Sequence, residues 1–306
     1  MSRLLHLGNA VVDLVLQVPQ APERGGDVLA SAASTLVGGG FNVMAAAARQ
    51  GLAVTYGGLH GTGPRGDQVR AALAAEGIEV QQPALPGCDS GLVVVIVEAD
   101  GERSFITASG AEAHLDAAAL ARLAVLPGDT VYLTGYSLAH PSSRDALVTW
   151  LPGLGAGPVV VFDPGPLVGT LPAVALAVVL ARSDWVSVNA AEATALTGET
   201  DPVHAAQALL ARTRGAGVVV RCGAAGCMVA VRGADPVSVP GIASDVVDLN
   251  GAGDAHVGAF IAQLASGVEP VAAARWANVA AGIAVERNGP ATAPTWAEVS
   301  ERLGRT

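Results

Sequence analysis

The sequence predicts an α/β protein with a three-layer, doubly wound parallel sheet and a small second β-sheet. Short runs rich in β-branched residues alternate with alanine-rich segments of helical pattern, and this alternation is typical of repeated βα units. One segment departs from it, because two apolar runs there are joined by an Asp-Gly turn. We expect a single domain over residues 1–306.

The expected strands of the large sheet are short and apolar, and helical patterns follow several of them. Buried strands are expected at residues 4–7, 54–57, 130–134, 158–163, 185–188 and 217–222.

The second sheet is expected from two parts of the chain, about 11–36 and 90–110. Residues 91–98 and 103–108 form a hairpin pattern around Asp100-Gly101, and residues 11–18 and 27–35 are further extended segments. An inserted sheet of this kind suits a lid that excludes water from a transfer reaction. An ordinary extension of the large sheet explains the same pattern.

Composition and charge exclude several classes of protein. The chain has 306 residues, 51% of them hydrophobic and 14% charged, which indicates a globular protein rather than a disordered one. A net charge of −10 argues against a nucleic-acid partner. The longest apolar run, near residues 173–181, is far shorter than the roughly 20 residues of a membrane span. His6, Asn9 and Asp13 interrupt the N-terminal apolar stretch, so we expect no signal peptide and a cytoplasmic location.

The cysteines and the basic residues narrow the chemistry further. Cys88, Cys222 and Cys227 match neither a disulfide framework nor a zinc pattern, and buried thiols are expected. All 17 basic residues are arginine. The chain therefore has neither the lysine of a Walker-type phosphate loop nor a Schiff-base lysine.

A helix is expected to begin near Gly253 and to bind an anion at its first turn. Gly251 and Gly253 flank Ala252 there, so the unpaired backbone N–H groups and the helix dipole are accessible to a phosphate. Gly267 is a natural end for this helix. Its apolar residues recur at helical spacing, at Val257, Phe260, Ile261 and Leu264.

Asp254 lies in the first turn of this expected helix. Beside a bound phosphate its carboxylate could take a proton from an attacking hydroxyl group. The same position also suits a helix cap or a partner of the helix dipole. The residues alone leave both roles open.

Several motifs together resemble those of the ribokinase, or PfkB, family of carbohydrate kinases. Residues 248–254, Asp-Leu-Asn-Gly-Ala-Gly-Asp, resemble its C-terminal signature, and residues 37–51 resemble its di-glycine segment with an asparagine that opens an alanine-rich helix. Asp13 stands where the family has an aspartate near the first strand. Further matches follow in the family's order at residues 101–105, 189–192 and 223–226 and at Asn278. The resemblance covers nearly the whole chain and implies a ribokinase-like fold.

The resemblance implies a role for the glycine-rich helix start. It makes Asp254 the general base that activates a sugar hydroxyl for attack on the γ-phosphate of ATP. The backbone N–H groups of Gly251, Ala252 and Gly253 would form the anion hole.

The resemblance also assigns the sugar-binding positions to Asp13, Gly38, Gly39 and Asn42. A carboxylate and a carboxamide can hydrogen-bond hydroxyl groups, and glycines let a substrate approach the backbone. A hinge and a helix cap are the alternative explanation of these residues.

Nucleotide and cation sites follow from the same resemblance. Glu192 would hold Mg²⁺ through water. Asp248 and Asn250, with carbonyl groups from residues 285–289, would bind a monovalent cation such as K⁺, although Asp248 also suits a capping role. Because lid sheets in the family often pair, a homodimer through the lid is expected. The nucleotide-binding positions would be Asn189, Gly223, Gly226 and Asn278.

The sequence also departs from the family pattern. The loop from Gly38 to Asn42 is about one residue short, Leu249 and Asn250 replace a common Thr-Thr, and Gly63 stands where an aspartate is usual. Residues 163–166 lack the usual asparagine and arginine. These differences affect the choice of substrate more than the reaction.

Two further residues near the expected site have open roles. His256 replaces a usual phenylalanine, and about 200° of helical rotation separates it from Asp254, which favours a structural histidine over a second base. Arg221 could contact nucleotide phosphate or face a carboxylate.

The sequence thus predicts an ATP-dependent kinase that phosphorylates a hydroxyl of a sugar or sugar-like molecule. A nucleoside kinase of the same family is the nearest alternative, with Phe41 and Phe105 as candidates for a base pocket. A non-catalytic sugar- or nucleotide-sensing protein is another. A dinucleotide-dependent oxidoreductase is disfavoured because residues 8–13 lack a Gly-x-Gly-x-x-Gly turn.

Overall fold

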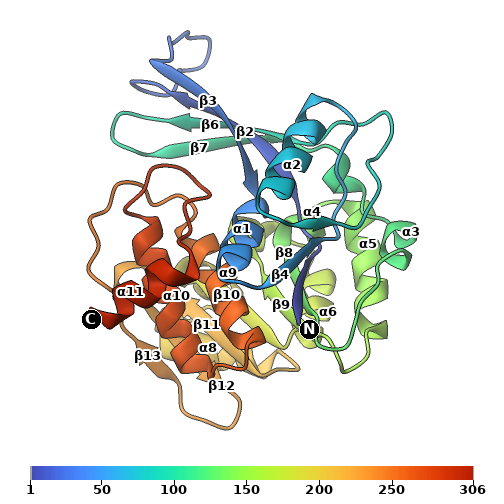
Figure 1. The fold of residues 1–306 in the computed structure, drawn as a ribbon, viewed down its shortest axis with the longest axis vertical. Coiled ribbons are helices and arrows are strands. Elements are labelled where there is room, and N and C mark those ends of the chain that lie inside the picture. The colour runs from blue at the N-terminus through green and yellow to red at the C-terminus, as the bar shows by residue number, and fades with distance from the viewer. Residues whose placement is uncertain (1, 306) are drawn as a thin grey trace.

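A nine-stranded sheet lies at the centre of residues 2–305, which the computed structural model describes (Figure 1). Its strand order is β13-β12-β11-β10-β9-β8-β1-β4-β5. In this order, every neighbouring pair between β11 and β5 is parallel. Strand β12 is antiparallel to β11 and to β13. The strands are β1 (Arg3–His6), β4 (Ala53–Tyr56), β5 (Glu79–Val80), β8 (Thr130–Thr134), β9 (Val159–Asp163), β10 (Trp185–Asn189), β11 (Gly217–Arg221), β12 (Cys227–Val231) and β13 (Val237–Val239).

Helices cover both faces of this sheet, which gives three layers. Neighbouring strand residues point to opposite faces, so Leu4 packs in one apolar cluster and Leu5 in the other. Helices α1, α2 and α9 to α11 contribute to the first cluster, and α3 to α8 to the second. The helices are α1 (Phe41–Arg49), α2 (Pro64–Ala75), α3 (Ala117–Ala121), α4 (Gly135–Ala139), α5 (Pro141–Trp150), α6 (Ala173–Arg182), α7 (Ala190–Thr197), α8 (Pro202–Ala211), α9 (Ala252–Ala265), α10 (Pro270–Ala284) and α11 (Trp296–Gly304).

The predicted fold class is confirmed, and each of the six predicted strands is present to within one residue at either end. The sequence did not predict β5, β12 or β13. Strands β12 and β13 join the sheet through short connections after β11, without an intervening α-helix, so they lack the βα pattern that identified the others.

A four-stranded sheet projects from the large one, at the top of Figure 1. Strand β2 (Ala10–Gln17) is antiparallel to β3 (Ala32–Gly39) and parallel to β6 (Leu92–Val97), which forms a hairpin with β7 (Arg103–Ala108). The hairpin turn has Gly101 at φ +88°.

Strand β3 differs from the extended segment predicted at residues 27–35. It begins at Ala32 and continues to Gly39, because it pairs with β2 along its whole length, from Gln17 opposite Ala32 to Ala10 opposite Gly39.

Helices α1 and α9 approach each other unusually closely at Gly258. A Cβ atom there would lie 2.5 Å from the Ala46 Cβ and 2.7 Å from the Val43 carbonyl oxygen, so the contact requires glycine. The close contact aligns the first turns of the two helices, which carry Asn42 and Asp254.

None of the helices in the described part of the chain has the length and apolar character needed to cross a membrane.

We expect Gly258→Ala to lower the free energy of unfolding by about 1–3 kcal/mol, because the added methyl group must push α1 and α9 apart. Urea denaturation would measure the change. Gly304→Ala is the matched control, since nothing lies within 4 Å of a Cβ atom at that helical position. An equal free energy of unfolding for Gly258→Ala and wild type would contradict the prediction, because it would show that α1 and α9 can move apart without loss of stability.

Candidate active site

A cavity of about 280 Å³ lies between the carboxyl ends of the large-sheet strands and one face of the small sheet. Ligands of open α/β sheets bind at this edge. The large-sheet side contributes residues at or just after the carboxyl ends of β1, β8, β9, β10 and β11, and the first turns of α1 and α9 close a second side. The small sheet supplies Val11, Asp13, Val93, Phe105 and Thr107.

Asp254 and Asn42 meet in this cavity. The Asn42 Nδ2 atom donates a hydrogen bond of 2.9 Å to Asp254 Oδ2, although 212 positions separate the two residues in the chain. Asp13, which is 9% exposed, also lines the cavity. The structure therefore brings together the predicted base and two predicted sugar-binding residues.

The two aspartates have unusual acidity. Burial raises the pKa of Asp254 to about 6, with a smaller increase from Asp163, while the Asn42 hydrogen bond and the charge of Arg221 act in the opposite direction. Burial, and then repulsion by Asp254, raise the pKa of Asp13 to about 6. Both carboxyl groups are ionised above about pH 6, and each can accept a proton more readily than an exposed aspartate can.

The two glycines predicted to bind sugar, Gly38 and Gly39, lie where a side chain would clash or be strained. A Cβ atom at Gly38 would lie 2.1 Å from the Asp13 Oδ2 atom, so any side chain there would displace the carboxylate. Gly39 lines the cavity and has φ +65°, a conformation that favours glycine.

The turn before α9 depends on Gly251. This residue has φ +78°, and a Cβ atom on it would lie 1.8 Å from the Pro290 carbonyl oxygen. Among residues 2–305, no side chain caps the helix. Gly253 is exposed and lines the cavity. The start of α9 thus has no side-chain cap among the described residues and borders the cavity, while the Ala252 N–H group donates to the Leu249 carbonyl oxygen at 3.4 Å.

Arg221 lies beside this helix start. Its Nη1 atom donates to Asp163 Oδ2 at 2.9 Å, and its Nη2 atom is 3.6 Å from Glu192 Oε2. A Cβ atom at Gly253 would lie 3.8 Å from the Arg221 Nε atom. Arg221 therefore faces carboxylates, which was one of the two roles expected for it. It also borders the expected phosphate position, so the second role, contact with nucleotide phosphate, fits as well.

Glu192 lines the cavity and is 6% exposed. Burial and the neighbouring Asp163 raise its pKa, against the effects of the Asn189 backbone N–H group and Arg221. Asn189 and Glu192 form a capping box at the start of α7, with reciprocal hydrogen bonds of 2.7 and 2.8 Å. Within residues 2–305, no group of three or more His, Cys, Asp or Glu side chains could hold a metal ion.

Asn189, Gly223, Gly226 and Asn278, the predicted nucleotide-binding residues, do not line the cavity. Asn278 is buried and donates hydrogen bonds of 3.0 Å to the Val239 and Pro240 carbonyl groups. Gly226, at φ +95°, approaches the same segment, since a Cβ atom there would lie 2.1 Å from the Val239 oxygen. Gly223 is in the same turn between β11 and β12. The structure groups Gly223, Gly226 and Asn278 around one segment.

The residues predicted for a monovalent cation lie next to the helix start. Asp248 is buried, and its Oδ1 atom accepts the Asn250 N–H group at 2.8 Å. The same carboxylate forms an ion pair with Arg103 of the small sheet. Asn250 lines the cavity.

His256 packs in the core beneath the site. It is 3% exposed, and its ring lies 6.3 Å from that of Phe260 in a stacked arrangement. Burial, with a further contribution from the charge of Arg221, lowers its pKa to about 3. The imidazole is therefore neutral at physiological pH and does not line the cavity, in agreement with a structural role.

The sequence analysis missed several residues that line the cavity, and of its two candidate base-pocket aromatics only one lines the cavity. Phe105 lines the cavity, whereas Phe41 belongs to the core between the layers. The missed residues lie at the carboxyl ends of predicted strands or just after them, so the edge rule for α/β sheets was a usable signal. These residues are Asn9, Thr134, Tyr136 and Asp163.

The fold is that of known ribokinases. A ribokinase from Arabidopsis thaliana, complexed with ribose and ATP, has a TM-score of 0.78 and 24% identity, with 98% of each chain covered. An adenosine kinase from Sinorhizobium meliloti has a TM-score of 0.84 and 24% identity, with 98% of this chain and 99% of the other covered. The protein is therefore of the ribokinase-like class.

Sequence comparison identifies the family. The pfkB family carbohydrate kinase pattern matches residues 1–297. The chain is 33% identical to the uncharacterised sugar kinase YegV of Escherichia coli, over 97% of this chain and 92% of that protein. The chain belongs to the PfkB family of carbohydrate kinases, and it is a phosphotransferase with an alcohol group as acceptor.

We expect Asp254→Asn to stabilise the fold at neutral pH. The carboxyl pKa rises from 3.8 to about 6 on folding, so the folded state disfavours the charged form. This cost is absent below about pH 3.8 and complete above about pH 6. The variant should gain about 1–3 kcal/mol at pH 8 and progressively less towards pH 5. Thermal unfolding across this range measures the difference.

Asp145→Asn is the control for this prediction, because the Asp145 side chain is 74% exposed. It should leave stability unchanged at each pH. A lower melting temperature of Asp254→Asn at pH 8 would contradict the prediction.

Proposed function

We propose that the protein transfers the γ-phosphoryl group of ATP to a hydroxyl of a sugar or sugar-like molecule, with Asp254 as general base. The observation that carries this proposal is the placement of Asp254 at the uncapped, glycine-led start of α9, hydrogen-bonded to Asn42 and facing Asp13 across the cavity. An acceptor hydroxyl near Asp254 would also be near the anion site.

In the proposed reaction, Asp254 takes the proton of the acceptor hydroxyl as its oxygen forms a bond to the γ-phosphorus. The bond between this phosphorus and the β,γ-bridging oxygen breaks, and ADP leaves with the electron pair. A base with a pKa of about 6 is ionised at neutral pH and remains basic enough to accept the proton. Asn42 fixes the orientation of the carboxylate through its hydrogen bond.

The charge that develops on the transferred group requires preorganised donors. The backbone N–H groups of Gly251, Ala252 and Gly253, together with the dipole of α9, are proposed to supply them. Arg221 adds a positive charge beside Gly253. This arrangement suits a chain that has no lysine.

The nucleotide and Mg²⁺ are proposed to lie on the β10–β11 side of the cavity. Asp163 and Glu192 carry two negative charges against the single charge of Arg221, which fits a hydrated divalent cation. Glu192 would hold Mg²⁺ through water, and the bound ion would neutralise phosphate charge. Asn189, Gly223, Gly226 and Asn278 would shape the nucleotide site.

The acceptor side of the cavity has one polar and one apolar wall. Asp13, Gly39 and Asn42 suit the hydroxyl groups of a sugar. Phe105 and Val93 from the small sheet suit a flat apolar group, and this observation favours a nucleoside as the second candidate acceptor.

Three further expectations remain predictions. They are the lid function of the small sheet, a homodimer through it, and a cytoplasmic location. The exposed Leu36 and Ile106 side chains of the small sheet support the expected dimer.

The first experiment measures ADP release with Mg-ATP and a panel of pentoses, hexoses, their phosphates and nucleosides. We expect turnover with one acceptor class and a loss of at least about a hundredfold in Asp254→Asn, because a general base contributes about 10²–10⁴-fold. Asp145→Asn is the matched control.

Equal turnover by Asp254→Asn would exclude the role proposed for this aspartate. ATP binding without turnover of any compound would support a sensing protein instead of an enzyme. Turnover of nucleosides alone would establish the second candidate.

The pH profile should report the pKa of Asp254. Since Asn42 lowers that pKa, we expect Asn42→Ala to move the acidic limb of kcat/KM from about pH 6 to higher pH. Asn42→Asp should move it further, because a second carboxylate repels the ionised form. An acidic limb that stays in place in both variants would show that Asp254 does not control it.

A further inference from the structure

An ion pair connects the small sheet with the loop that precedes α9. Arg103 is the first residue of β7, and its Nη2 atom lies 2.5 Å from the Asp248 Oδ1 atom. The side chains are 22% and 6% exposed, so the pair is largely shielded from solvent. A shielded pair between an arginine and a carboxylate is stronger than one at an open surface.

The Asp248 carboxylate has no oxygen left without a partner. Oδ1 accepts the Asn250 N–H group at 2.8 Å in addition to Arg103, and Oδ2 accepts the Gly289 N–H group at 3.1 Å. These bonds and the Arg103 charge lower the pKa of Asp248 against the effect of burial, so it is ionised at neutral pH. Its single charge is already balanced by Arg103.

Val285, the first of the residues 285–289 whose carbonyl groups were expected at the cation site, is also engaged. The Val285 oxygen accepts N–H groups from Val247 at 2.8 Å and from Asp248 at 3.1 Å. A potassium ion needs several oxygen atoms directed at one point, and here Asp248 and Val285 instead bind N–H groups. The residues therefore do not fit the cation that the family resemblance implies.

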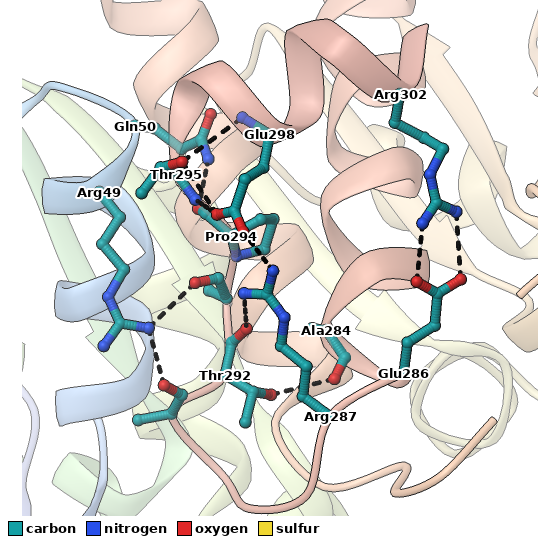
Figure 2. A network of polar contacts seen from close by, with 12 residues as sticks. Arg49, Gln50, Ala284, Glu286, Arg287, Thr292, Pro294, Thr295, Glu298 and Arg302 are labelled. Carbon is teal, nitrogen blue, oxygen red and sulfur yellow. Dashed lines mark hydrogen bonds and ion pairs between the residues drawn. The ribbon is translucent and has the colours of Figure 1, made fainter. Parts of the chain in front are cut away.

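Polar contacts hold the segment after Val285 in this arrangement (Figure 2). Glu286 pairs with Arg302 at 2.7 Å, and Arg287 pairs with Glu298. Farther along, Arg49 of α1 donates to the carbonyl groups of residues 291 and 293 at 2.7 and 2.9 Å. Glu286, the one acidic side chain of residues 286–294, is thus neutralised by Arg302 and is not free to compensate an added cation beside Asp248.

We propose that the guanidinium group of Arg103 takes the place of a monovalent cation beside the anion hole, so that this kinase works without potassium. The inference rests on the proposed function for its activity readout. Arg103 is a positioning residue: through Asp248 it orients the Asn250 N–H group and hence the turn that leads to Gly251. A potassium ion at Asp248 would be repelled by the guanidinium charge.

The test compares wild type with Arg103→Ala in KCl and in choline chloride at equal ionic strength. Wild-type kcat/KM and melting temperature should be the same in both salts. Arg103→Ala should lose about tenfold or more of kcat/KM in choline chloride, because a charged hydrogen bond is removed. KCl should restore part of this loss and should raise the melting temperature of the variant alone.

Two controls accompany this test. Arg305→Ala, which removes a surface ion pair with 72% and 64% exposed side chains, should behave as wild type. Arg103→Lys retains the charge and should keep most of the activity without potassium. If the lysine variant instead matches Arg103→Ala, the geometry of the guanidinium rather than its charge is required, and replacement of a cation by charge would be excluded.

Potassium stimulation of the wild type, or indifference of Arg103→Ala to potassium, would overturn the proposal. If no acceptor is phosphorylated, the proposed function fails, but the melting temperatures in the two salts still decide whether potassium binds beside Asp248. The two failures can therefore be distinguished.

Discussion

The close contact between α1 and α9 at Gly258 is the constraint on which the site depends. Both helices begin at the cavity, and their first turns carry Asn42 and Asp254, which meet at 2.9 Å only because the helix axes approach so closely. The large sheet determines where these helices begin, and the small sheet adds Asp13 opposite them. Packing deep in one layer thus determines the geometry of a polar site at the edge of the sheet.

Charge is distributed around the cavity in two groups with different properties. Asp13 and Asp254 have no arginine within ion-pair distance among the described residues, and burial raises both of their pKa values. Asp163, Glu192 and Arg221 form a paired group in the same cavity, and the charges of Asp163 and Arg221 shift the pKa of Asp254 in opposite directions. For the proposed reaction, the cavity thus offers two basic carboxylates beside an ion-paired cluster.

Local sequence signals were sufficient for some parts of the structure and insufficient for others. The β-branched run of β8 determined that strand to the residue, and the glycines before Asp254 indicated the start of α9. Strand β3 was misplaced because its glycines have weak strand propensity and its extent depends on pairing with β2. The Arg103–Asp248 pair spans 145 positions and is formed by tertiary structure, so no local pattern could indicate it.

Gly251 and Asp254, both in the signature segment at residues 248–254, are constrained for different physical reasons. Its left-handed backbone and its approach to the Pro290 carbonyl group exclude every other side chain, whether or not phosphate is bound. A descendant that had lost the reaction would still retain this glycine for the sake of its fold. Asp254, in contrast, costs stability as a buried charge and would be replaced early in such a lineage. With the role proposed for Asp254, this aspartate is therefore a better marker of a working enzyme than Gly251.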